Sequence, residues 1–200
     1  MTKTPIAWVV VSSFLLLLVI GLLVASPNEI VRTATTIQST VTVTRSVTVE
    51  AAPGNPRWEP YFSPGGGADD RLAYWLDRSN SSICAMIYTF TSDTISDALI
   101  RAHSRGVHVK ITMDQSQLSV PGGEAQTLVD SGIAVRIDRR SGLLHNKVAI
   151  IDNTIVVTGS YNWTAAAEER NRENLLIIQD PQLASPYQSN CEATWDVSTP

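Results

Sequence analysis

The sequence predicts an α/β domain with a mixed β-sheet flanked by helices on both faces, preceded by an N-terminal transmembrane helix. Three observations lead to this fold class. Apolar segments of strand length alternate with helical segments from about Trp58 to the C-terminus. Those strand segments are apolar nearly throughout, as expected when both faces of a sheet are covered. The beginning of the chain has a different composition, with one long uncharged apolar run.

That run is Ile6–Ala25, twenty residues without a charge, which follows a short tail over residues 1–5. Its length is about what a membrane-spanning helix needs. A cleaved secretory signal is the rival interpretation, since Lys3 supplies a positive charge ahead of the run. The run exceeds the usual signal length, and Pro27 disfavours cleavage after Ser26. We expect a membrane anchor with the following domain outside the cytoplasm, or a secreted domain if the segment is cleaved.

Residues 26–56 form a linker rich in threonine and valine, which alternate from Val41 to Val49. As a strand this segment would have a valine face and a threonine face. As a tether it is polar and fairly stiff, and it ends in proline, glycine and asparagine. We favour the tether and leave short edge pairing and a membrane-proximal coiled assembly open, and we place the folded domain at residues 57–200.

The first half of the domain is expected to alternate strands and helices. The helix at 69–78 carries Leu72, Trp75 and Leu76 on one side, and the next helix has capping residues at its start and Gly106 as a stop signal. The expected elements are, in order, a strand at 61–64, a helix at 69–78, a strand at 82–88, a helix at 91–106 and a strand at 107–113.

The second half continues the pattern and adds a hairpin. The sequence "DNT" supplies turn residues between two apolar segments, and Gly132 ends the helix before them. The expected elements are, in order, a helix at 122–131, a strand at 133–137, a hairpin of strands at 144–151 and 155–158, a short helix at 163–169, a strand at 174–178 and a final helix up to Trp195.

The charge and the cysteine content of the chain exclude few classes of function. The net charge of the chain is -4, and eleven basic against seventeen acidic side chains from Trp58 onward leave -6 for the domain. An acidic domain weighs against strong polynucleotide binding, although a local basic patch can suffice. Cys84 and Cys191 are either two small core residues or a disulfide of an exported domain. No Cys/His cluster indicates zinc, and no cofactor or metal site is expected.

The stretch "GLLHNKVAIIDNTIVVTGSYNWT" concentrates chemically active side chains in an apolar context. On a strand, His145 and Lys147 share a face. The imidazole can serve as a nucleophile or an acid–base group, and the ammonium can bind a phosphate oxygen. Asp152 follows at the hairpin turn, where we expect it to initiate the turn and also to support the site by hydrogen bonding.

The returning strand ends in "GSYN". Gly159 permits close backbone approach, and the hairpin brings Ser160 and Asn162 back towards His145 as donors for an oxyanion. Glu173 lies at the entry of the next strand, where a carboxylate would orient the His145 ring, or would pair with a nearby arginine at the surface.

Two further groups have less specific interpretations. Arg139 and Arg140 either extend a cationic surface along a polynucleotide or occupy a solvated turn. Tyr161 and Trp163 are expected in the core or in a dimer contact rather than as base-stacking platforms.

The spaced constellation resembles the phospholipase D superfamily. The HxKxxxxD motif matches at His145, Lys147 and Asp152, and a GSxN element and a Glu-Asn pair follow. The segments "YFSP", "YTFTSDTISDALIRAHSRGVHVKITMDQSQ" and "PYQSNCEATWD" resemble the single-motif bacterial and archaeal nuclease branch, so that the resemblance covers about Trp58 to Asp196. It implies a phosphodiesterase that needs no metal, with a phosphohistidine intermediate at His145 and a phosphate cradle of Lys147, Ser160 and Asn162.

The resemblance also implies a second histidine, which protonates the leaving oxygen and then activates water. His103 and His108 lack the motif around them and are expected to be structural. We therefore expect a homodimer whose two-fold axis brings together His145 from each copy.

Two activities follow as hypotheses. The first is a membrane-tethered endonuclease of relaxed sequence preference that acts on DNA or RNA. The alternative is a hydrolase of anionic phospholipids such as cardiolipin, because an anchor would hold the site near a bilayer. A non-catalytic phosphate-binding module is the third class, which the intact constellation disfavours.

Overall fold

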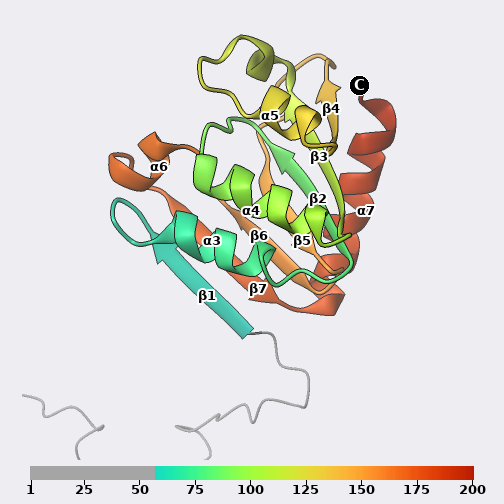
Figure 1. Cartoon of the computed structure of the whole chain (residues 1–200). Coiled ribbons are helices and arrows are strands. Elements are labelled where there is room, and N and C mark those ends of the chain that lie inside the picture. The colour runs from blue at the N-terminus through green and yellow to red at the C-terminus, as the bar shows by residue number, and fades with distance from the viewer. Residues whose placement is uncertain (1–56) are drawn as a thin grey trace, which may run out of the picture. The chain divides into compact units, whose positions relative to one another are not determined.

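A computed structural model describes residues 57–200, which contain a seven-stranded sheet with helices on both of its faces (Figure 1). The predicted anchor at 6–25 and linker at 26–56 lie outside the described residues. The strands are β1 Arg57–Phe62, β2 Ser82–Ile87, β3 His108–Asp114, β4 Ala134–Asp138, β5 Lys147–Ile151, β6 Ile155–Gly159 and β7 Asn174–Gln179. The helices are α3 Ala68–Leu76, α4 Asp93–Ser104, the 3-10 helix η1 Gln115–Ser119, α5 Ala125–Asp130, α6 Ala165–Glu169 and α7 Pro181–Val197. Among these helices, none is long and apolar enough to cross a membrane.

The sheet is mixed, as predicted, and its strand order is β1-β7-β6-β5-β2-β3-β4. Strands β2, β3 and β4 run parallel because α4 and α5 provide the crossovers between them. The β5–β6 hairpin is antiparallel to β2 on one side and to β7 on the other, and β1 forms the edge beyond β7.

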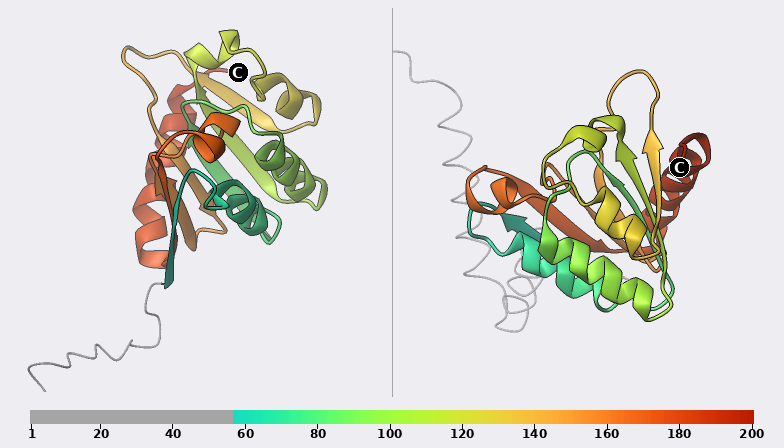
Figure 2. Two further views of the ribbon diagram at one scale, coloured as in Figure 1. Left: turned by 90° about the vertical axis from the view of Figure 1, so that its left-hand side faces the viewer. Right: turned by 45° about the horizontal axis from the view of Figure 1, so that its top comes forward.

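Each face of the sheet has its own apolar core, since successive strand residues point to opposite faces. On one face, buried residues of α3 and α4 such as Leu72 and Leu99 pack on Ile111 and Ala149. On the other face, α7 covers a smaller cluster that includes Met86 and Ile150. Figure 2 shows α7 on the opposite side of the sheet from α3 and α4. Residues 53–200 form one compact unit that contains both cores.

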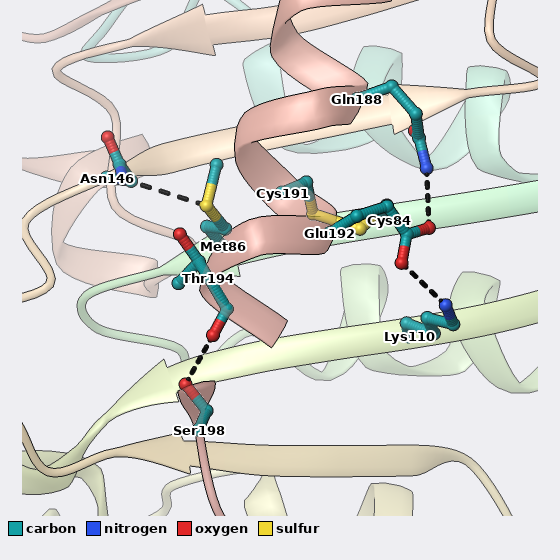
Figure 3. The surroundings of a disulfide bond; sticks show 9 residues. All are labelled: Cys84, Met86, Lys110, Asn146, Gln188, Cys191, Glu192, Thr194 and Ser198. Atoms are coloured by element: carbon teal, nitrogen blue, oxygen red, sulfur yellow. Dashed lines mark hydrogen bonds and ion pairs between the residues drawn. A yellow bond between two sulfur atoms is a disulfide. The ribbon is translucent and has the colours of Figure 1, made fainter. Parts of the chain in front are cut away.

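A disulfide between Cys84 and Cys191 joins β2 to α7 across the second core (Figure 3). Both cysteines are buried, and 107 residues separate them in the sequence. The two cysteines were expected to be either separate core residues or a disulfide. The structure has the disulfide, which links the C-terminal helix α7 to the central part of the sheet.

Several element boundaries differ from the expected ones. Strand β1 spans six residues rather than the four expected at 61–64, because pairing with β7 extends it back to Arg57. Strand β5 begins at Lys147 instead of Leu144, because the Leu143 carbonyl accepts a hydrogen bond from the His145 N–H in a tight turn. Helix α5 is shorter than the segment expected at 122–131, and η1 was not predicted.

Candidate active site

Five of the six predicted site residues meet at one edge of the sheet, which we call the site edge. It is formed by the ends of β1, β2, β3, β4 and β6 and by the starts of β5 and β7. The strand pairing shows that these ends lie at the same edge. Ile87 at the end of β2 pairs with Lys147 at the start of β5, and Gly159 at the end of β6 pairs with Leu175 near the start of β7. His145, Ser160, Asn162 and Glu173 are adjacent to these strand ends.

His145 is exposed and lies just before β5, and contacts from neighbouring elements fix its backbone. The carboxylate of Asp114 accepts a hydrogen bond from the Leu144 N–H at 2.7 Å. On the other side of His145, the Asn146 carbonyl accepts a hydrogen bond from the Tyr88 N–H at 2.9 Å. The Tyr88 ring also lies against the imidazole, with 4.7 Å between the ring centroids. The imidazole is therefore held at the site edge while its ring remains accessible.

Lys147 is buried, with 5% of its surface exposed. Its ammonium donates a hydrogen bond to the His145 carbonyl at 2.8 Å and lies 5.1 Å from the centre of the Tyr88 ring. Burial lowers the pKa of Lys147, and the negative charge of Glu173 opposes that effect. An ammonium group has three N–H donors, and within residues 57–200 one of them has a partner. A phosphate oxygen would satisfy the remaining donors of this partly desolvated cation.

Ser160 and Glu173 form a bonded pair where β6 leads into the GSYN turn. The Ser160 hydroxyl donates to the Glu173 carboxylate at 2.5 Å and accepts from the Asn174 N–H at 3.1 Å. Asn171 donates to the second carboxylate oxygen of Glu173 at 3.2 Å. These contacts engage Glu173 with the GSYN turn, so its predicted role of orienting the His145 ring stays a prediction.

Gly159 has a φ angle of 148°, in the region that favours glycine, and a Cβ atom at this position would collide with the Asn174 carbonyl. The close approach lets that carbonyl accept the N–H groups of both Ser160 and Tyr161. The requirement for glycine in the GSYN turn is therefore a matter of backbone packing between β6 and β7.

The side chain of Asn162 has a buried Oδ1 atom without a hydrogen-bond partner among the described residues. Tyr161 and Trp163 on either side of it are fully buried, in agreement with their assignment to the core. The Tyr161 hydroxyl donates to Glu168 of α6 at 2.9 Å, and Trp163 packs edge-on against Phe90. The contacts of Tyr161 and Trp163 fix the backbone on both sides of Asn162.

Asp152 lies at the opposite edge of the sheet, at the far end of β5 from His145. Its carboxylate accepts hydrogen bonds from the N–H groups of Asn80, Ser81 and Ser82. Burial alone would raise the pKa of Asp152, but these bonds outweigh it and lower the pKa. The prediction that Asp152 supports the site by hydrogen bonding is corrected accordingly: it holds the β5–β6 turn against the start of β2.

The other two histidines of the chain also lie away from the site edge. His108 begins β3 and pairs with Ser82 at the opposite edge. His103 belongs to the last turn of α4, where Arg105 reaches the carbonyl of Ser79, near the same opposite edge. Since the chain has three histidines, one copy of it contributes a single histidine, His145, to the site edge.

Two pairs of exposed arginines flank the site edge. Arg139 and Arg140 lie in the loop between β4 and His145, where Arg140 pairs with Asp138 and lowers the pKa of that carboxyl through their hydrogen bonds. Arg170 and Arg172 lie in the loop before β7, next to Glu173.

Sequence reasoning missed two residues that contact the motif. Tyr88 ends the β2 segment and touches both His145 and Lys147, and Asp114 ends β3 and binds the backbone next to His145. The sequence indicated these two residues in one way only. Each stands at the end of an apolar strand segment, where polar side chains of neighbouring strands lie close together at the edge of a sheet.

The chain resembles known proteins over most of its described residues. Residues 72–195 match the family model described as a cardiolipin synthase, PLD-like domain. A mitochondrial cardiolipin hydrolase of Xenopus tropicalis is 38% identical over 133 residues, which cover 66% of this chain and 63% of that protein. A phospholipase D of Rickettsia felis is 43% identical over 129 residues, which cover 64% of each protein. This chain thus spans less than two thirds of the length of these relatives.

Among solved structures, that of Nuc from Salmonella typhimurium, a phospholipase D family member, aligns with a TM-score of 0.68 and 36% sequence identity. The alignment covers 72% of this chain and 96% of Nuc.

Proposed function

Because the chain belongs to the phospholipase D superfamily, we propose that it is a metal-independent phosphodiesterase, and specifically a homodimeric endonuclease that hydrolyses DNA or RNA. The observation that supports the proposal best is the arrangement at the site edge. An exposed imidazole lies beside a buried ammonium with unused donors and beside the GSYN turn, where the Ser160 hydroxyl is bonded to Glu173 and the Oδ1 of Asn162 has no partner among the described residues. This combination suits attack on phosphorus with the nonbridging oxygens held in place.

The reaction is proposed to take place in two displacements. In the first, a ring nitrogen of His145 attacks phosphorus, and the bond to the leaving oxygen breaks as that oxygen takes a proton from a second His145 in the partner copy. In the second, the partner imidazole removes a proton from water, and the resulting nucleophile displaces His145 from phosphorus. Lys147 and Asn162 bind the nonbridging oxygens, which carry the developing charge in both steps.

The dimer is proposed because each copy supplies one histidine to the site edge while the chemistry requires two. Two exposed leucines near the motif support a contact between copies there. Leu143 is two residues from His145 and is 61% exposed, and Leu118 of η1 is 58% exposed. Apolar side chains of this size around a two-fold axis would stabilise the pairing that brings the imidazoles together.

Nucleic acid is proposed as the substrate for two reasons. The domain resembles the single-motif nuclease branch along nearly its whole length, and the alignment with Nuc leaves almost none of that protein unmatched. The arginine pairs on both sides of His145 suit an extended chain of phosphates more than a single headgroup.

A phospholipid is the second candidate substrate, and a specific observation favours it. Two relatives above 35% identity are a cardiolipin hydrolase and a phospholipase D. Cardiolipin carries two phosphodiesters, and the same imidazole and ammonium groups would act on them. The net charge of -6 from Trp58 onward also favours a local phosphate contact over a long polyanion track.

The test uses the compact unit of residues 53–200 in buffer with EDTA. Plasmid DNA, single-stranded DNA, RNA and cardiolipin vesicles are offered separately, and products are followed by electrophoresis or by lipid chromatography. We expect nucleic-acid cleavage without added metal, together with loss of activity in His145→Ala. The matched control is His108→Ala, which removes an exposed histidine at the opposite edge and should leave activity unchanged.

Three results would count against the proposal. Dependence of cleavage on a divalent cation would contradict the mechanism. Turnover of cardiolipin without cleavage of nucleic acid would select the second candidate. Full activity of His145→Ala would remove the basis of both candidates.

A further inference from the structure

One part of the sheet surface is apolar and is not covered by any other part of residues 57–200. We call it the apolar strip, and it consists of Trp58, Pro60 and Phe62 of β1 with Leu176 and Ile178 of β7. Register places these residues on one face, because Trp58 pairs with Ile178 and Pro60 pairs with Leu176. The face is the one that carries α7, since Ile178 pairs with Val156, a member of the core beneath that helix.

Helix α7 packs mainly on β2 to β6, whereas β1 and β7 lie side by side at one end of the sheet. Trp58 is 65% exposed and Phe62 is 66% exposed, while Leu176 and Ile178 are half-buried. Scattered single apolar residues at a protein surface are ordinary, but a contiguous set on two adjacent strands indicates an interaction surface.

The position of the strip in the chain indicates what covers it. Strand β1 directly follows the linker, so Trp58 is the second described residue after it. The linker of residues 26–56 in turn follows the uncharged run Ile6–Ala25, whose length suits a bilayer. Even as a flexible coil, such a linker has a root-mean-square span of roughly 30 Å. A bilayer that held the apolar run would therefore be within reach of the strip.

The composition of the strip suits a lipid surface. Tryptophan is the residue most typical of the boundary between headgroups and acyl chains, and phenylalanine adds apolar area beside it. Strand β1 is an edge strand with few neighbours, so its side chains can enter the interfacial layer without displacing another element.

We propose that the apolar strip is a lipid-docking surface that seats the domain on the bilayer through Trp58 and Phe62. Docking would also orient the site. Phe62 pairs with Asn174, which contacts Ser160 of the phosphate-binding turn, so one end of the strip reaches the site edge. The proposal goes beyond the enzymatic activity and does not depend on which phosphodiester is cleaved.

The experiment measures partitioning of the compact unit of residues 53–200, which lacks the apolar run, onto vesicles. The vesicles contain phosphatidylcholine alone, or phosphatidylcholine with a minority of phosphatidylglycerol, and bound protein is separated by sedimentation. We expect binding to both, and the double variant Trp58→Thr/Phe62→Thr should bind at least about tenfold more weakly because it removes most of the apolar area. Threonine was chosen because it is a β-branched residue that favours the strand conformation of β1.

Val129→Thr is the matched control, because it changes a half-exposed apolar residue on α5, away from the strip. Its partitioning should equal that of the unaltered domain. Cleavage of a soluble substrate should be unaffected by either change, since none of these residues takes part in catalysis. A second measurement needs no variant: brominated phosphatidylcholine should quench part of the tryptophan fluorescence of the unaltered domain, in which Trp58 is 65% exposed.

The proposal is overturned if the unaltered domain does not bind vesicles, or if the double variant binds as well as the control. It is also overturned if the double variant converts a dimer into a monomer in sedimentation analysis, because the strip would then face a second copy of the chain. If the double variant does not fold, the quenching experiment decides, and absence of quenching rejects lipid contact.

Discussion

At the scale of single residues, the position of His145 depends on groups that are far from it in the sequence. Asp114 is 1% exposed, and its two carboxylate oxygens accept the N–H groups of Leu144 and Ser116. One bond fixes the backbone immediately before His145, and the other fixes the start of η1. A displacement of the carboxylate would therefore shift the proposed nucleophile while leaving the GSYN turn, which has no bond to Asp114, in place.

We predict that Asp114→Asn lowers kcat by about 100-fold while KM changes little. The amide keeps one acceptor and turns a donor towards a backbone N–H, so the turn before His145 moves, whereas the GSYN turn remains in place. Steady-state kinetics on the cleaved substrate provide the measurement. Asp97→Asn on the exposed face of α4 is the control, and a loss carried mainly by KM would contradict the positioning role.

The contrast between His145 and Asp114 shows what the sequence can predict at this scale. The spacing of His145, Lys147, Ser160 and Asn162 is local and motif-like, so their common edge was predictable from one hairpin. The bond from Leu144 to Asp114 joins residues 30 positions apart and depends on the parallel β2–β3–β4 arrangement. Asp152 illustrates the opposite error, since its place in the motif suggested a role at the site that its place in the fold does not support.

A pH-dependent stability is expected from Asp152. Its pKa is lower in the folded protein than in an unfolded chain, so its bonds stabilise the fold above the unfolded pKa and are lost as the pH falls through the folded pKa. We predict that Asp152→Asn lowers the free energy of unfolding by about 2 kcal/mol at neutral pH. Asparagine tolerates the φ angle of 52°, so backbone strain adds little.

Urea unfolding at several pH values checks this prediction. The difference between Asp152→Asn and the unaltered protein should be largest near neutrality and should shrink in acid, where Asp152 itself becomes protonated. A difference that stays constant down to acidic pH would show that the charge of Asp152 does not contribute.

At the scale of elements, apolar segments predicted which strands exist, and tertiary contacts set where they begin and end. Strands β2 and β3 are buried on both faces, so their hydrophobic runs are unambiguous in the sequence. The start of β1 depends on pairing with β7, more than a hundred residues later, and no local signal marks it. The 3-10 helix η1 is held by Gln117, which bonds the backbone of Tyr88 and Phe90, again a contact between distant segments.

The disulfide between β2 and α7 allows a prediction of how much the attachment of α7 contributes to stability. Its closed loop of 107 residues implies a stabilisation on the order of 4 kcal/mol through restriction of the unfolded chain. The double variant Cys84→Ala/Cys191→Ala should lose about that amount in urea unfolding. Its kcat should be unchanged while it is folded, because the bond lies in the core beneath α7 and not at the site edge.

Reduction of the unaltered protein offers the matched comparison, since it opens the same bond without changing the sequence. Equal unfolding midpoints for oxidised and reduced protein would indicate that α7 is held by packing alone. Loss of kcat in the folded double variant would instead show that α7 helps to position the site.

At the scale of the whole molecule, the proposed two-histidine mechanism requires more than one copy of the chain. One copy brings one histidine to an edge that also exposes Leu118 and Leu143, while the remaining two histidines of the chain lie elsewhere. A second copy placed on a two-fold axis at this edge would supply the missing acid–base group and cover the leucines.

The shared site makes a quantitative prediction for mixed dimers. If both imidazoles act in one site, a dimer with one His145→Ala chain is inactive, so activity falls with the square of the unaltered fraction when the two chains are mixed and allowed to exchange. If each copy works alone, activity falls in direct proportion to that fraction. Mixing with His108→Ala chains is the control and should leave activity constant, because that histidine lies at the opposite edge. A linear dependence on His145→Ala content, with exchange of chains verified by differently tagged copies, would contradict the shared site and leave the second proton donor to be found within one chain.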